Sequence, residues 1–110
     1  MNVVASYYGT GDGFHGKTTA SCTRFKRNAR TVAHRRLPFG TKVRLENPKT
    51  GRTSFATVTD YGPRVRKRTL DVSTMLANEL GFYAEGTTNL LLVVLDVPEK
   101  PVYGQACKHK

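Results

Sequence analysis

The sequence predicts a mainly β protein that forms a small closed barrel. Strand-like segments outnumber helical ones, and short turn signals separate them. No internal repeat is visible, and 110 residues are enough for one domain with one hydrophobic core. We therefore expect a single domain over residues 1–110, mainly β, with one or two short helices.

Three stretches before residue 60 have the pattern of strands. The first is Val3–Tyr8, and the second is Lys42–Asn47, which alternates charged and apolar residues with a period of two. The third is Thr53–Thr59, which is rich in β-branched residues. Residues 47–51 read NPKTG, which is typical of a turn, so the second and third strands are expected to form a hairpin.

One short helix and one long strand are expected in the second half. Ser73 can cap a helix that runs through Leu80, and Gly81 stands where a glycine commonly ends a helix. Thr88–Val97 is almost continuously apolar, so we expect a strand that is buried on both faces. Pro98 then ends regular structure.

The charge of the chain is strongly positive and unevenly placed. The net charge is +10; residues 1–70 carry 15 Lys/Arg against 3 Asp/Glu, and residues 71–110 carry 3 against 5. Such a field attracts polyanions and acidic protein surfaces. The basic residues are dispersed and accompany no known nucleic-acid motif, so no specific nucleic-acid partner is expected.

Location and assembly follow from what the chain lacks. No apolar run approaches the roughly 20 residues that span a bilayer, and a strand pattern begins at once, without a signal peptide. A cytosolic protein and the mature form of a secreted one fit equally, and we adopt the secreted form. A closed barrel leaves few sheet edges, so we expect a monomer.

The two cysteines, Cys22 and Cys107, are too far apart for a CxxC motif. We expect one disulfide that ties the C-terminal tail to the early loop and stabilises the fold by about 4 kcal/mol. Two unrelated thiols in a reducing compartment are the alternative. His15 and His109 have no carboxylate or cysteine at ligand spacing, so neither a metal nor another cofactor is expected.

Four motifs follow one another in an order that resembles the rare lipoprotein A family. They are GFHGKTTA at 13–20, RTVAHRRLPFGTKVRLEN at 30–47, VTDYGP at 58–63 and TLDVS at 69–73, and an apolar strand follows. The resemblance covers roughly residues 5 to 95. It implies a six-stranded double-psi β-barrel, the fold also used by expansins, barwin-like proteins and some small secreted protease inhibitors.

The resemblance also places the parts of a sugar-cleaving site. Wall-cleaving members carry a Glu in an NGExF segment, a His in AAH and an Asp in DRGP. His34 and Asp60 match the last two, whereas Thr23 stands at the Glu position and Tyr61 at the Arg position. A threonine hydroxyl does not titrate in the useful range, and glycosidic cleavage needs an acid, so no catalytic residue is expected.

Asp60 and Asp71 are the pair that expansin-like barrels retain, and they would mark a binding groove. Alternatively, Asp71 satisfies backbone amides before the helix, Asp60 fixes a turn, and His34 is a core or turn histidine.

Aromatic and basic residues complete the expected binding face. Aromatic faces suit the C–H groups of sugars, but adjacent strand residues point opposite ways, so one of Tyr7 and Tyr8 belongs to the core. The stretch 64–68 (RVRKR) forms either a basic edge beside the groove or a solvated loop. The expected binding residues are Tyr8, Phe14, Asp60, Tyr61, Arg64, Arg66 and Asp71.

Three functions remain open. We favour a proteinaceous inhibitor of papain-like cysteine proteases, because the chain is small, lacks a wall-anchoring module and has lost the acid, and because rigid loops suit tight inhibition. The first alternative is expansin-type binding to peptidoglycan or another cell-wall glycan. The second is a peptidoglycan lytic transglycosylase with an altered active site. The expected partner is thus a cysteine protease or a cell-wall glycan.

Overall fold

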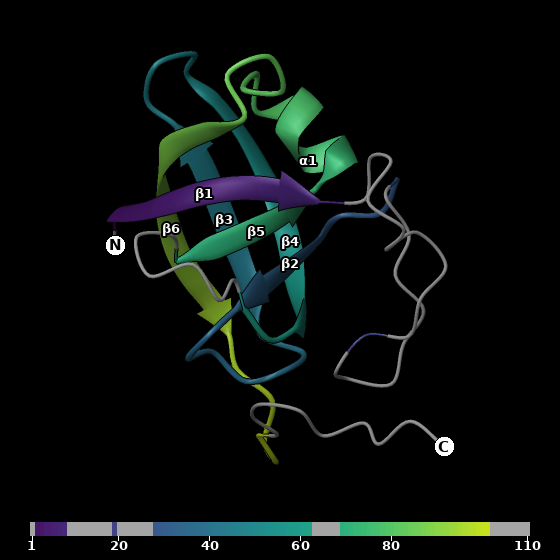
Figure 1. Cartoon of the computed structure of the whole chain (residues 1–110). Coiled ribbons are helices and arrows are strands. Elements are labelled where there is room, and N and C mark those ends of the chain that lie inside the picture. Colours follow the sequence, from purple (N-terminus) through teal and green to yellow (C-terminus); the bar gives the residue numbers. More distant parts are fainter. Residues whose placement is uncertain (1, 9–18, 20–27, 63–68, 102–110) are drawn as a thin grey trace.

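The computed structural model describes residues 2–8, 19, 28–62 and 69–101, which form a closed six-stranded barrel (Figure 1). This confirms the mainly β barrel that the sequence predicts. The strands are β1 (Asn2–Tyr8), β2 (Thr31–His34), β3 (Lys42–Asn47), β4 (Arg52–Asp60), β5 (Leu70–Ser73) and β6 (Thr87–Asp96), and helix α1 (Thr74–Glu79) lies between β5 and β6.

The strand order around the barrel is β1-β5-β2-β4-β3-β6, with β6 closing on β1. The pairs β1–β5 and β2–β4 are parallel, and the other pairs are antiparallel. Each parallel pair joins strands that are far apart in the sequence. As a result β1, β5 and β2 lie side by side at the front of Figure 1, although β5 begins about 60 residues after β1 ends.

The predicted hairpin of β3 and β4 is confirmed, with pairs running from Lys42–Thr57 to Asn47–Arg52. Its turn closes where the Gly51 N–H donates to the Asn47 carbonyl at 2.8 Å, and Gly51 has a φ of +72°. The buried Asn47 amide then donates from Nδ2 to the Leu80 carbonyl at 2.8 Å, which ties the hairpin to the end of α1.

The predicted helix is also confirmed. Ser73 is its N-cap, since its hydroxyl accepts the Leu76 N–H at 3.4 Å, and Leu80 is its C-cap. Gly81 follows with a φ of +79°, a conformation that glycine adopts without steric cost. The helix packs against β1, β4 and β5 and closes one end of the barrel.

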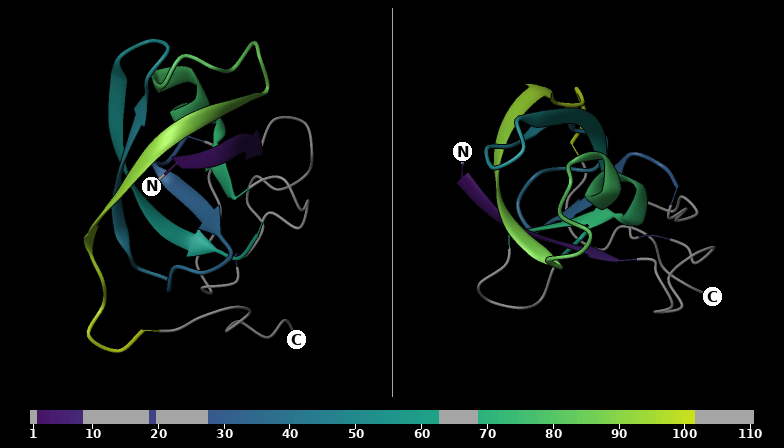
Figure 2. Two further views of the ribbon diagram at one scale, coloured as in Figure 1. Left: turned by 90° about the vertical axis from the view of Figure 1, so that its left-hand side faces the viewer. Right: turned by 90° about the horizontal axis from the view of Figure 1, so that it is seen from above.

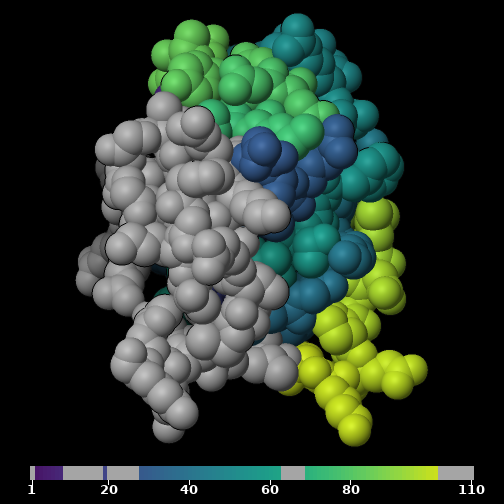
Figure 3. Space-filling view, turned by 90° about the vertical axis from the view of Figure 1, so that its right-hand side faces the viewer, coloured from purple at the N-terminus to yellow at the C-terminus, as the bar shows by residue number. Residues whose placement is uncertain are grey.

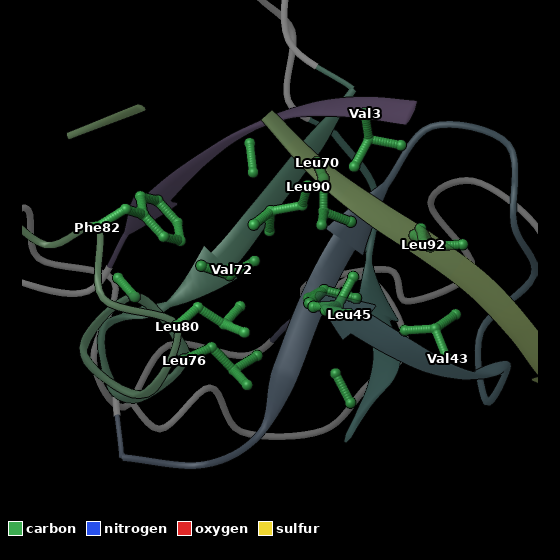
Figure 4. Close-up of a cluster of buried hydrophobic side chains, with 14 of the residues drawn as sticks. Val3, Val43, Leu45, Leu70, Val72, Leu76, Leu80, Phe82, Leu90 and Leu92 are labelled. Carbon is green, nitrogen blue, oxygen red and sulfur yellow. The ribbon is translucent and has the colours of Figure 1, made fainter. Parts of the chain in front are cut away.

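The hydrophobic core fills the inside of the barrel and receives side chains from every strand (Figure 4). Leu76, Leu80 and Phe82 fill the end beneath the helix, and Val43 and Leu92 lie toward the other end. Figure 2 shows the strands wrapping around this interior from two further directions.

The prediction that the last strand is buried on both faces is wrong. Leu90 and Leu92 are each 1% exposed, but Leu91, Val93 and Leu95 are 36%, 43% and 51% exposed. A barrel strand has one face toward the core and one toward the outside. A continuous apolar run does not show whether another element covers the outer face, so the exposure of that face could not be predicted from the run alone.

No helix in the described part of the chain has the length and apolar character needed to cross a membrane.

Candidate functional site

Strand pairing brings two aspartates into one row across four strands. Ser6 on β1 pairs with Asp71 on β5, Asp71 pairs with Ala33 on β2, and Ala33 pairs with Asp60 on β4. We call Ser6, Asp71, Ala33 and Asp60 the carboxylate row. Neighbouring strands are about 4.8 Å apart, so the α-carbons of the two aspartates are separated by about 10 Å.

Asp71 is held from the side of β1. The Ser6 hydroxyl donates to Asp71 Oδ1, and Ser6 itself is buried. On β5 the neighbours Leu70 and Val72 face the core, so Asp71 lies on the outer face. Ser73, and not Asp71, is the N-cap of α1, which leaves the Asp71 carboxylate on the barrel wall.

Asp60 ends β4 at an irregularity of the sheet. The register of β2 and β4 shifts between Val32 and Ala33, so that Thr59 is skipped and Asp60 stands beside Ala33. Asp60 is half-buried, and its Oδ1 accepts the backbone N–H of Tyr61 at 2.9 Å. It therefore makes the turn contact that the sequence suggested. The adjacent residue Tyr61 is 42% exposed.

His34 ends β2 and is only 2% exposed. Its Nδ1 accepts backbone N–H bonds from Arg36 at 3.0 Å and from Leu37 at 3.1 Å. A nitrogen that accepts these bonds carries no proton, so the ring is neutral with its proton on Nε2. Burial, followed by the positive charge of Arg36, lowers the pKa of His34. His34 is therefore a turn histidine, and its Nε2 has no hydrogen-bond partner among the described residues.

The segment that leads into β2 is anchored to the helix. Arg30 forms two hydrogen bonds of 2.9 Å with the Glu79 carboxylate. In Figure 3 the blue segment before and within β2 lies directly below the green helix, in agreement with this ion pair. The anchor fixes the start of the strand that carries Ala33 and His34.

The two adjacent tyrosines of β1 point to different sides. Tyr8 packs against Ala33, next to the carboxylate row, and is only 8% exposed. Tyr7 packs against the core, as the alternation predicts for one of the two, and its ring stacks on Tyr83. Little of the Tyr8 ring is therefore open to solvent.

Several predicted site residues lie outside the described part of the chain. These are Phe14, Cys22, Thr23, Arg64, Arg66 and Cys107. Among the described residues, no three His, Cys, Asp or Glu side chains come together in a way that could hold a metal ion.

Sequence reasoning missed Ser6 and Tyr83. The period of two along β1 places Ser6 on the same face as Tyr8, and this signal could have found it. Tyr83 contacts Tyr7 across 76 residues of sequence, and no local sequence pattern predicts such a contact.

Comparison with known proteins identifies the family. The sequence model of the lytic transglycolase family matches residues 1–92. The chain belongs to this family. A Nostoc protein named probable endolytic peptidoglycan transglycosylase RlpA is 46% identical over 92 residues, which are 84% of this chain and 25% of that protein. An Aquifex aeolicus protein of the same name is 46% identical over 82 residues, 74% of this chain and 35% of that protein. The chain thus spans only about a quarter to a third of these relatives.

Solved structures confirm the double-psi barrel of this lytic transglycolase domain. An expansin from Clavibacter michiganensis has a TM-score of 0.66 at 22% identity, over 92% of this chain and 54% of the expansin. The Streptomyces papain inhibitor has a TM-score of 0.64 at 20% identity, over 84% and 93% of the two chains. Cerato-platanin 3 from M. perniciosa has a TM-score of 0.67 at 14% identity, over 87% and 95%. These likenesses show the shared fold alone.

The prediction of a papain-like protease inhibitor is wrong. The likeness to the papain inhibitor is one of fold, at 20% identity, whereas relatives at 40% and 46% identity are named transglycosylases. Small size and rigid loops are properties of the barrel fold whatever its function, so they do not distinguish a protease inhibitor from other proteins with this fold.

Proposed function

We propose that this domain cleaves the glycan strands of peptidoglycan as a lytic transglycosylase, with Asp60 as the group that transfers the proton. Membership of the lytic transglycolase family over residues 1–92 carries the proposal. Asp60 supports it as the carboxylate at the family's Asp position, held at the end of β4 next to an exposed tyrosine.

The proton balance of this reaction closes on a single carboxyl group. The bond from C1 of one sugar to the oxygen of the next sugar breaks, and the C6 hydroxyl of the first sugar forms a new bond to C1. The leaving oxygen gains one proton and the C6 hydroxyl loses one, so that no water is consumed. Asp60 donates its proton to the leaving oxygen and, as a carboxylate, then takes the hydroxyl proton. Thr23 at the family's Glu position is compatible with this scheme.

The rest of the site binds and orients the strand. Asp71, fixed by Ser6, accepts hydrogen bonds from sugar hydroxyls about two strands away from Asp60. The net charge of +10 attracts the anionic wall polymer and raises the rate of encounter. Because peptidoglycan lies outside the cytoplasmic membrane, this function requires an exported domain.

Digestion of purified peptidoglycan tests the proposal. The wild-type domain should release anhydro-muropeptides, and Asp60→Asn should slow their release by at least about 100-fold, as the loss of a general acid–base does. Asp96→Asn, at the exposed end of β6, is the matched control and should leave the rate unchanged. No product from the wild type, or full activity in Asp60→Asn, would refute the assignment.

One observation favours a second candidate, which is binding without cleavage. Thr23 stands at the position of the family's Glu, and the domain has Asp60 and Asp71, the pair of aspartates that expansin-like barrels retain. One expansin of this fold has been solved in complex with cellohexaose. Retention of the wild-type domain on insoluble peptidoglycan without any soluble product would select this candidate.

A further inference from the structure

An uncovered apolar surface lies on the outer side of β6, β3 and β4. On β6, Leu91 and Val93 are 36% and 43% exposed, and on β4 Phe55 is 60% exposed. Strand pairing puts Val93 opposite Arg44 of β3 and Arg44 opposite Phe55, and it puts Leu91 opposite Glu46. We call these five residues the β6–β3 face. The left view of Figure 2 shows β6 at the front of the barrel, where no other described element lies over it.

The β6–β3 face carries no net charge, in contrast to the chain as a whole. Strands β3 and β6 together hold two basic residues, Lys42 and Arg44, and two acidic residues, Glu46 and Asp96, whereas the net charge of the chain is +10. A neutral surface offers little attraction to an anionic polymer or an anionic membrane. Two copies of this chain would repel each other least here, because charges more than about 8 Å away are largely screened at physiological salt.

The order of charges along β3 fits a second copy. Arg44 and Glu46 lie on the same side of the strand, about 7 Å apart along it. Their Nη1 and Oε1 atoms are 3.8 Å apart and both side chains are partly exposed, so this ion pair contributes little stability within one molecule. Consider a two-fold axis that lies in the plane of contact, at right angles to β3, and passes midway between the two residues. It sets Arg44 of each copy against Glu46 of the other.

The same axis brings apolar side chains together. Strand β6 of one copy then runs opposite to β6 of the other, so that Leu91 of each copy meets Val93 of the other. Sheets pack face to face at about 10 Å, a spacing at which such side chains interdigitate. Contact through a face needs no free sheet edge. The closure of the barrel, on which the expectation of a monomer rests, therefore does not prevent it.

We propose that the β6–β3 face is the interface of a two-fold symmetric dimer of this domain, held by reciprocal Arg44–Glu46 ion pairs and by contact of Leu91 with Val93. In the order around the barrel, β3 and β6 lie opposite β5 and β2, the strands that carry the middle of the carboxylate row. The dimer leaves both rows open on its two far sides. It goes beyond the proposed function and does not depend on it, since association is measured without any glycan.

Sedimentation equilibrium tests the dimer. At about 0.15 M salt and between about 1 and 500 µM protein, a range that covers weak pairs, the average mass of the wild type should rise with concentration toward twice the monomer mass. Arg44→Glu and Glu46→Arg should each raise the dissociation constant at least about tenfold, because each makes both symmetric contacts repulsive. The double variant Arg44→Glu/Glu46→Arg restores both attractions and should return the constant to within about threefold of the wild type.

The design separates this contact from the effects of net charge and folding. The two single variants change the net charge in opposite directions, so general repulsion between positive chains would weaken association in Glu46→Arg and strengthen it in Arg44→Glu. Glu85→Arg makes the same charge change as Glu46→Arg at an exposed residue before β6, and it should change the dissociation constant less than about twofold. Val93→Thr replaces a methyl group with a hydroxyl and should raise the constant about fivefold. Urea unfolding of each variant verifies that its monomer is folded.

The outcomes judge the dimer apart from the proposed function. A mass that stays at the monomer value up to the highest concentration would refute the dimer and leave the face to a different partner. Association that both single variants leave intact, or that the double variant does not restore, would refute this arrangement of the face. In these cases the proposed function stands, because cleavage by a monomer needs no interface. A wild-type domain that associates as expected but cleaves no glycan would leave the dimer in place and refute the proposed function alone.

Discussion

Replacing His34 with leucine should destabilise the fold by about 2–4 kcal/mol. The ring nitrogen Nδ1 is the acceptor for two backbone N–H groups, those of Arg36 and Leu37, at 3.0 and 3.1 Å. Each donor left without a partner costs about 1–3 kcal/mol, and the lower half of that range applies because the turn is only partly buried. Leucine fills much of the ring volume, so the cavity adds little.

Asparagine at the same position is the matched variant. Its side-chain oxygen can accept the N–H two residues ahead, as in an Asx turn, so His34→Asn should lose about half as much stability. Urea unfolding at pH 8 measures both differences, provided that the m values of the three proteins agree. Equal stability of His34→Leu and the wild type would refute the role of Nδ1.

The same histidine makes stability depend on pH. The folded-state pKa of His34 lies below the unfolded value of about 6.5, so the unfolded chain binds the proton more readily. The stabilisation is therefore fully present above the unfolded pKa and is lost as the pH falls through the folded pKa. The stability advantage of the wild type over His34→Asn should shrink from pH 8 to pH 5. The other two histidines cancel in this difference, and a constant difference would contradict the lowered pKa of His34.

Three further comparisons test the fold by urea unfolding. Leu92→Ala should cost about 2–5 kcal/mol and Leu91→Ala less than about 1 kcal/mol, because only the first side chain is buried; similar losses would contradict a one-sided β6. Asn47→Asp should cost about 1–3 kcal/mol, because a carboxylate cannot donate a hydrogen bond to the Leu80 carbonyl at the end of α1. An unchanged urea midpoint would show that this hydrogen bond does not stabilise the fold. Gly51→Ala should cost about 1 kcal/mol for its positive φ, and Gly81→Ala should cost more, since its new Cβ would meet a threonine methyl at 3.1 Å; the reverse order would refute the packing there.

The elements with strong local signals were predictable from the sequence. The β3–β4 hairpin follows from period-two alternation around an NPKTG turn, and both strands lie within one residue of the expected bounds. Helix α1 follows from its Ser73 cap and from Gly81. In each case the residues that specify the element are close neighbours in the chain.

The short strands β2 and β5 could not be identified in this way. Each has four residues, TVAH and LDVS, which is too few for a periodic pattern. They form strands because each pairs with two neighbours in the barrel: β2 lies between β4 and β5, and β5 lies between β1 and β2. These pairings join segments that are not adjacent in the sequence. Only the family resemblance implied the total of six strands.

The candidate site also combines residues that the sequence predicts with contacts that it does not. His34, Asp60 and Asp71 stand in recognisable motifs, and the structure brings their strands together. The partner of Asp71 and the stack on Tyr7 depend on contacts across 65 and 76 residues. The protease-inhibitor prediction failed because it relied on features of the scaffold, and scaffold features do not distinguish the functions that one fold can carry.

Mass spectrometry of a peptidoglycan digest in ¹⁸O-labelled water tests the central claim most directly. If the C6 hydroxyl attacks and a carboxyl passes the proton, the new chain ends will be anhydro sugars that contain no label. New reducing ends in place of anhydro ends would show that water attacks, and a digest without new ends would show that this domain does not cleave the strand.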